Sequence, residues 1–268
     1  MLDYMVNFFI SWFTEPNILG IGLAIAFGAV WLAGYWPPLF KKPWLWAVIV
    51  ASAFLSLVAV SFIQIPLQIL VGQALGNFWS QETIMQWVLL AGIPQILLSG
   101  LVQEGSKMVP MVVWWWRSGR KIDPKWGLII GAAAGAGFGI FEAVWAHKLI
   151  FASGWSWELV QTSGLMALAG FWERFFTVAF HIAISALVGY GLAKGWGWQC
   201  YLLAAFLHSL LNYSAVLLTA GVLTAVSLEI LVAVAVVIFT GVILWFRWRK
   251  PASADRNPSG EEAPVTEQ

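Results

Sequence analysis

Seven long apolar stretches make up most of this sequence, and they restrict the folds that are open to it. The hydrocarbon core of a bilayer is about 30 Å thick, which an α-helix crosses with about 20 apolar residues. Only 10% of the residues are charged and 60% are hydrophobic, whereas about a quarter of a soluble domain is charged. The sequence therefore predicts an all-α polytopic membrane protein with about seven transmembrane helices.

The apolar stretches divide the chain into three parts. Residues 1–16 are apolar but short, and we expect an N-terminal interfacial helix there. Residues 17–246 are predicted to form a single transmembrane domain, and residues 247–268, rich in Pro, Ser and Glu, a disordered cytoplasmic tail. The spans are predicted at residues 17–36, 43–63, 87–116, 126–151, 165–192, 198–218 and 222–246. The polar stretch 64–86 is predicted to be a loop with an interfacial helix.

Lysines and arginines give the predicted orientation. Eleven of the 14 fall in alternate connections or in the tail, which puts them on one side of the membrane. Because such residues collect on the cytoplasmic side, we predict the N-terminus outside and the C-terminus inside. No basic cluster is long enough to bind a duplex, so we expect no nucleic acid partner.

A carboxylate and an ammonium group interrupt the third span. An ionisable group near the bilayer centre costs roughly 2.5–3.5 kcal/mol, so each should have a partner or a function. Glu104 and Lys107 are three residues apart and differ by about 60° around a helix, so both can face one cavity. A purely structural pair that fixes the helix bundle is the simpler interpretation.

The next three predicted spans also carry polar groups. They are Glu142 in the fourth span, Glu173, Arg174 and His181 in the fifth, and His208 and Asn212 in the sixth. Arg174 and His181 differ by only about 20° around a helix, and His208 and Asn212 are one turn apart. Polarity confined to four consecutive helices favours one shared internal site over isolated ion pairs.

Glycines precede the carboxylate of the fourth span. Gly131, Gly135 and Gly139 recur every four residues, which forms a ridge that lets another helix approach closely. The ridge would bring Glu142 near a neighbouring backbone. Such ridges often serve packing alone.

The motifs together resemble the glutamic-type intramembrane proteases of the PrsW and YhfC families, which are related to CAAX prenyl endopeptidases and bacterial ABI proteins. The motifs are Glu104-Gly-Ser-Lys107, Gly137-Phe-Gly139-Ile-Phe-Glu142, Glu173-Arg174 with His181 and Gly189, and His208-Ser-Leu-Leu-Asn212. The resemblance covers about residues 103–212 and implies a catalytic core at about 87–218. It implies a peptidase in the plasma (inner) membrane of a prokaryote that acts on a membrane protein or a lipidated peptide.

The resemblance also implies roles for the polar residues. Glu104 would activate a water as general base, helped by Glu142 or His181. His208 and Asn212 would form an oxyanion hole. The supporting residues Lys107, Arg174 and Glu173 would hold this set in place. No metal or other cofactor is required, since a carboxylate in a low-dielectric site is a strong enough base near neutral pH.

One position departs from the family pattern and leaves alternatives open. PrsW-type sequences carry two adjacent glutamates, and Gln103 stands at the first position. A non-catalytic pseudoprotease that binds membrane partners is therefore one alternative. A zinc metalloprotease with Glu104, Glu142, His181 and His208 as ligands is another, although the His-Glu-x-x-His spacing is absent. A proton-coupled transporter is the third.

Overall fold

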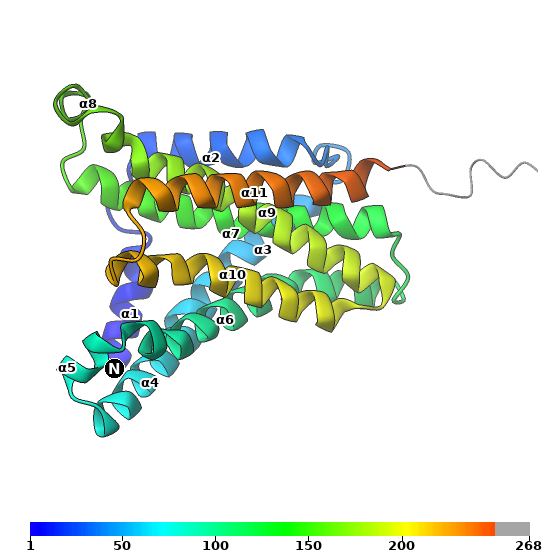
Figure 1. Ribbon diagram of the computed structural model, residues 1–268. Helices are drawn as coiled ribbons and strands as arrows, with labels where there is room; N and C mark the ends of the chain where they lie inside the picture. The colour runs from blue at the N-terminus through cyan, green and yellow to red at the C-terminus, as the bar shows by residue number, and fades with distance from the viewer. Residues whose placement is uncertain (250–268) are drawn as a thin grey trace, which may run out of the picture.

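The computed structural model describes residues 1–249, and every regular element within this range is helical (Figure 1). The larger part of the predicted tail, residues 250–268, lies outside the described residues. The helices are α1 (Leu2–Ser11), α2 (Ile18–Ala33), α3 (Trp44–Ala59), η1 (Val60–Gln64), α4 (Ile65–Phe78), α5 (Gln81–Gln86), α6 (Val88–Arg117), α7 (Pro124–Ala152), α8 (Trp157–Ser163), η2 (Gly164–Leu168), α9 (Ala169–Lys194), α10 (Gly197–Thr219) and α11 (Ala225–Trp248).

Length and composition make this an integral membrane protein. Six helical segments among residues 1–249 are long and apolar enough to cross a membrane: Trp44–Phe78, Val88–Arg117, Pro124–Ala152, Trp157–Lys194, Gly197–Thr219 and Ala225–Trp248. They correspond to six of the predicted spans. The other, at residues 17–36, contains α2, whose 16 residues extend only about 24 Å at 1.5 Å per residue. A seventh crossing and the orientation in the membrane remain predictions.

Residues 64–86, predicted to be a loop with an interfacial helix, are helical over most of their length, so the loop part of the prediction is wrong. The helix that begins with α3 passes through the π-helical turn η1 and continues as α4 to Phe78, and the short helix α5 follows. The polar side chains that suggested a loop are satisfied within the bundle. Gln68 Nε2 donates to the carbonyl oxygen of Gln95 at 2.9 Å, and Gln95 Nε2 donates to that of Gln68 at 3.0 Å. These two bonds hold α4 against α6.

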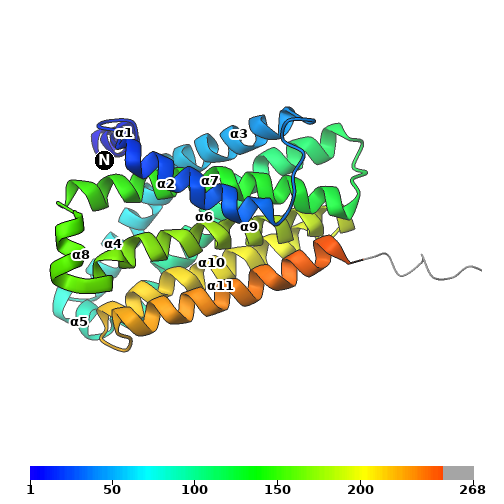
Figure 2. The ribbon, with the colours of Figure 1, turned by 90° about the horizontal axis from the view of Figure 1, so that it is seen from above.

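The core of the bundle is the contact between α7 and α9, which lie side by side at its centre (Figure 2). Gly131 faces the backbone carbonyl of Ser185, and Gly135 faces that of His181. A Cβ atom at either glycine would collide with these carbonyl oxygens. The predicted glycine ridge is therefore confirmed, and it brings the two backbones close together over several turns.

The basic connections gather at one end of the bundle. The α2–α3, α6–α7 and α9–α10 connections and the end of α11 lie together in both views, opposite α5 and α8 (Figures 1 and 2). Arg247 Nε donates to the carbonyl oxygen of Tyr35 at 3.0 Å and ties α11 to the end of α2. This arrangement supports the predicted grouping of positive charge.

A lysine and a histidine near the end of α7 bond the N-terminal helices. Lys148 Nζ donates to the carbonyl oxygen of Ser11 at 2.9 Å, at the end of α1, and also to that of Thr14. His147 is fully buried, and its Nδ1 lies 2.9 Å from the carbonyl oxygen of Gly20 in α2. Both α1 and α2 are thus held against α7.

Replacing Gly131 by alanine tests the importance of the α7–α9 contact. We expect Gly131→Ala to lower the free energy of unfolding by about 1–3 kcal/mol, because the two helices must move apart to accept the methyl group. The measurement is unfolding of the purified protein in mixed detergent and SDS. Gly241→Ala on α11 is the matched control, since nothing lies within 4 Å of its added Cβ. Equal stability of the two variants would contradict the packing role.

Candidate active site

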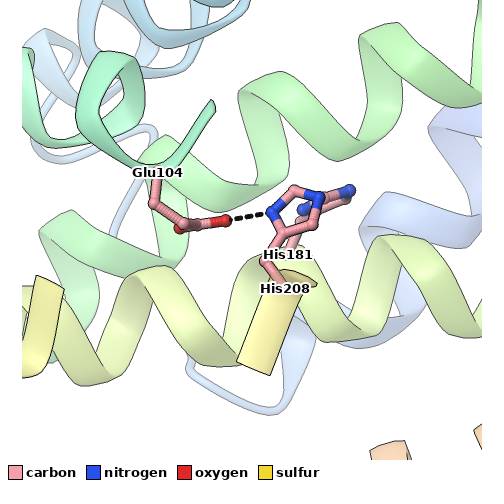
Figure 3. Close-up of side chains that lie close together, drawn as sticks. All are labelled: Glu104, His181 and His208. Atoms are coloured by element: carbon pink, nitrogen blue, oxygen red, sulfur yellow. Dashed lines mark hydrogen bonds and ion pairs between the residues drawn. The ribbon is translucent and has the colours of Figure 1, made fainter. Parts of the chain in front are cut away.

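The centre of the polar site is a buried ion pair on α6. Glu104 and Lys107 have 1% and 0% of their side chains exposed, and Lys107 Nζ donates to Glu104 Oε1. The same carboxylate oxygen accepts a hydrogen bond of 2.6 Å from Nδ1 of His208 on α10 (Figure 3). The structure therefore brings the predicted residues of α6 and α10 into direct contact.

His181 on α9 joins this pair to a second one. Its Nδ1 lies 3.1 Å from Lys107 Nζ, and its Nε2 lies 3.1 Å from Glu142 Oε2 on α7. Because an ammonium group can only donate, Nδ1 accepts and Nε2 carries the hydrogen that Glu142 accepts. His181 is thus a neutral bridge between a cation and a carboxylate.

The second ion pair completes the chain of polar side chains. Arg174 donates from its NH1 nitrogen to Glu142 Oε2 at 3.2 Å, and it also pairs with Glu173. The chain therefore runs without interruption through seven predicted residues on four helices: His208, Glu104, Lys107, His181, Glu142, Arg174 and Glu173.

Packing around His181 fixes the orientation of its ring. The ring of Phe138 on α7 meets the imidazole edge to face, with 4.7 Å between the centroids. Lys107 Nζ lies 5.2 Å from the centre of the same phenyl ring, within cation–π range. Gly139 lies directly beneath the Cβ of His181. The glycine motif that precedes Glu142 therefore shapes the pocket for the histidine.

A cavity of about 340 Å³ opens beside this chain. Its wall contains six of the predicted residues: Glu142, Glu173, Arg174, His181, His208 and Asn212. Glu104, Lys107 and Gln103 are not part of the wall and lie behind it. The cavity also touches apolar residues of α10 and α11, such as Leu211 and Val232.

Residues that the sequence did not single out also line the cavity. Asn212 Nδ2 donates to Ser99 Oγ at 3.1 Å, and Gln103 Nε2 donates to the same oxygen at 3.1 Å. Gln68 and Thr177 are on the wall as well. A signal for part of this set was present, because Gln95, Ser99 and Gln103 repeat every four residues and so share one face of α6.

Comparison with known proteins shows which family a segment of this chain is similar to. Residues 147–237 match the YhfC intramembrane metalloprotease family. The match confirms the predicted resemblance to YhfC proteins and covers about a third of the chain, at 147–237 where the prediction gave about 103–212. The segment similar to YhfC proteins contains the site residues of α9 and α10, whereas those of α6 and α7 precede it. No curated protein and no solved structure matches the chain.

The YhfC family description raises the question of a metal, and three side chains have suitable ligand atoms. One atom from each of Glu104, His181 and His208 lies within 4.8 Å of the others. Two histidines and a glutamate are a known ligand set of catalytic zinc. Glu104 Oε2 is buried without a hydrogen-bond partner among the described residues. Glu142, the fourth ligand predicted, is outside this group.

Lys107 would compete with a metal ion for these ligand atoms. Its ammonium group already bonds Glu104 and His181, two of the three candidate ligands. Two cations cannot share these atoms at such short range, because their repulsion is strong in a low-dielectric interior. The donor set fits a metal ion only if Lys107 withdraws.

The buried Glu104–Lys107 pair should be important for stability. We expect Lys107→Met to lower the free energy of unfolding by about 3–5 kcal/mol, because it leaves the Glu104 carboxylate buried without its cation. Adding Glu104→Gln removes that charge and should restore much of the loss, which unfolding in SDS measures as a double-mutant cycle. If Lys107→Met alone leaves stability unchanged, the two groups are not coupled as described.

Proposed function

We propose that the protein is an intramembrane peptidase that hydrolyses a peptide bond of a membrane protein or a lipidated peptide. The observation that carries the proposal is a cavity among membrane-spanning helices with Glu142, His181, His208 and Asn212 on one wall. The match to an intramembrane protease family supports it. A carboxylate, imidazoles and an amide around one cavity supply the base and the hydrogen-bond donors that peptide hydrolysis needs.

The geometry favours Glu142 over Glu104 as the base. Glu142 is on the cavity wall with 23% of its side chain exposed, so a water molecule can reach it. Glu104 is 1% exposed, and Lys107 and His208 both bond its Oε1. A base must lie within hydrogen-bond reach of the water that it deprotonates. In this proposal Glu104 instead orients His208.

His208 has one ring nitrogen left for the cavity. Its Nδ1 donates to Glu104, and Nε2 has no partner among residues 1–249. A carboxylate on one nitrogen fixes the ring so that the other meets the substrate. When protonated, Nε2 donates to the scissile carbonyl oxygen together with the amide of Asn212, which is one helical turn away.

The reaction follows from these positions. Glu142 takes a proton from water, and the water oxygen bonds to the carbonyl carbon while the donors hold the developing oxyanion. The C–N bond then breaks, and the proton passes from Glu142 to the departing nitrogen. The products are a new carboxyl end and a new amino end, and Arg174 keeps the Glu142 carboxylate in position throughout.

Replacing Glu142 tests the proposal directly. Purified protein is reconstituted in liposomes with a set of single-span transmembrane peptides and a prenylated peptide, in water enriched in ¹⁸O. Mass spectrometry then detects new ends and ¹⁸O in the new carboxyl group. We expect Glu142→Gln to reduce the rate by about 10²–10⁴-fold, because it removes a general base. Glu82→Gln, at an exposed carboxylate on α5, is the control. Cleavage by Glu142→Gln at the wild-type rate would refute the role.

A zinc-dependent reaction is the second candidate, and the convergence of Glu104, His181 and His208 favours it. Zinc held by these residues would supply Lewis-acid polarisation of the scissile carbonyl. The metal-free proposal rests on Lys107, whose ammonium group bonds two of those ligands.

Chelation distinguishes the two candidates. We expect cleavage in the liposome assay to persist after treatment with 1,10-phenanthroline, and elemental analysis of the purified protein to give much less than one zinc per chain. Retained activity with little zinc supports the metal-free reaction. One zinc per chain, together with loss of activity on chelation and recovery on adding zinc, would replace it with the metalloprotease.

A further inference from the structure

Four glutamines on α4, α6 and the turn η1 form a chain of hydrogen bonds beside the cavity. Gln68 Nε2 donates to the backbone carbonyl oxygen of Gln95 at 2.9 Å. Gln64 Nε2 donates to Gln68 Oε1 at 3.4 Å, and Gln103 Nε2 donates to Gln64 Oε1 at 3.1 Å. All four side chains are wholly or partly buried within the bundle.

The backbone carbonyl at one end fixes the direction of the whole chain. A carbonyl oxygen only accepts, so the amide nitrogen of Gln68 must face Gln95 and its oxygen must face Gln64. That in turn points the oxygen of Gln64 at Gln103, which must present its nitrogen. Reversing any one amide would place two donors or two acceptors together. Gln103 is therefore held as a donor, and its own Oε1 remains buried without a partner in the described part of the chain.

The row of hydrogen-bonded glutamines ends at Ser99, where it determines the direction of the hydroxyl hydrogen. Ser99 Oγ accepts from Gln103 Nε2 at 3.1 Å and from Asn212 Nδ2 at 3.1 Å. A hydroxyl has two lone pairs and one hydrogen, so both lone pairs are in use and the hydrogen remains to be donated. No group within residues 1–249 accepts it, and Ser99 lies on the cavity wall with His208 and Asn212.

We propose that Ser99 is a further catalytic residue, which donates a hydrogen bond to the scissile carbonyl oxygen, and that Gln103 is a positioning residue that directs this hydrogen. The inference rests on the proposed peptidase function. A donor aimed at a developing oxyanion acts mainly in the transition state, so its loss lowers kcat more than it changes KM.

The same geometry explains why a glutamine serves at position 103. A carboxylate there has no hydrogen to donate and would accept the hydrogen of Ser99, which would then point away from the cavity. Gln103→Glu introduces the residue that the PrsW pattern carries, yet we expect it to lower kcat. If the protein were instead a pseudoprotease inactivated by Gln103, Gln103→Glu would raise kcat.

The test compares Ser99→Ala with Ser99→Thr in the liposome assay described above. We expect Ser99→Ala to lower kcat by about 100-fold with little change in KM, since it removes one oxyanion donor. Ser99→Thr keeps the hydroxyl and should retain kcat near wild type. Ser52→Ala is the control, because Ser52 is also buried in a helix but does not line the cavity. Wild-type kcat in Ser99→Ala would overturn the assignment.

Gln103→Glu provides the second arm, with thermal unfolding in detergent to check its fold. A lower kcat supports the directed hydrogen bond, and an unchanged or higher kcat overturns it. If Gln103→Glu does not fold, Gln103→Leu replaces it and is expected to lower kcat by loss of the donor. Absence of cleavage by the wild-type protein would reject the peptidase reaction itself. Loss of cleavage in Glu142→Gln with full activity in Ser99→Ala would reject only the role of Ser99.

Discussion

The close contact between the backbones of α7 and α9 determines how Glu142 and His181, the central members of the candidate site, meet. It is possible only because Gly131 and Gly135 have no side chains to keep the helices apart. At this separation Glu142 and His181 come within 3.1 Å of each other, where Arg174 bonds Glu142 and Lys107 bonds His181. The same helix contact that forms the core therefore also positions residues of the candidate site.

The second constraint is the need to compensate charge away from water. Two carboxylate–cation pairs, Glu104 with Lys107 and Glu142 with Arg174, are joined through the neutral ring of His181. Burying one of these charges alone would cost several kcal/mol, so the members stabilise one another as a set. Of the carboxylates of these two pairs, Glu142 lies on the cavity wall and Glu104 does not. That asymmetry separates the structural pair from the pair that we propose for catalysis.

The sequence predicted the helices and the shared site because both depend on regular spacing. Apolar runs gave the spans, and the angular separation of Glu104 from Lys107 and of Arg174 from His181 gave their common faces. The prediction failed where tertiary partners replaced water. Gln64 and Gln68 looked like loop residues, yet side chains and carbonyls of α4 and α6 satisfy them. Whether a carboxylate lies on the cavity wall depends on its depth in the bundle. Spacing along one helix predicts the face of the helix but not this depth.

The π-helical turn at Val60–Gln64 has a consequence for how this protein can vary. A π-turn contains one residue more than an α-turn, so it rotates the following helix by about 100° relative to the preceding one. The phase of α4, and with it the facing of Gln64 and Gln68 toward α6, depends on that extra residue. Deletion of a single residue here would leave α3 intact while turning the two glutamines away from α6. This stretch lies outside the sequence motifs, yet it should tolerate insertions and deletions poorly.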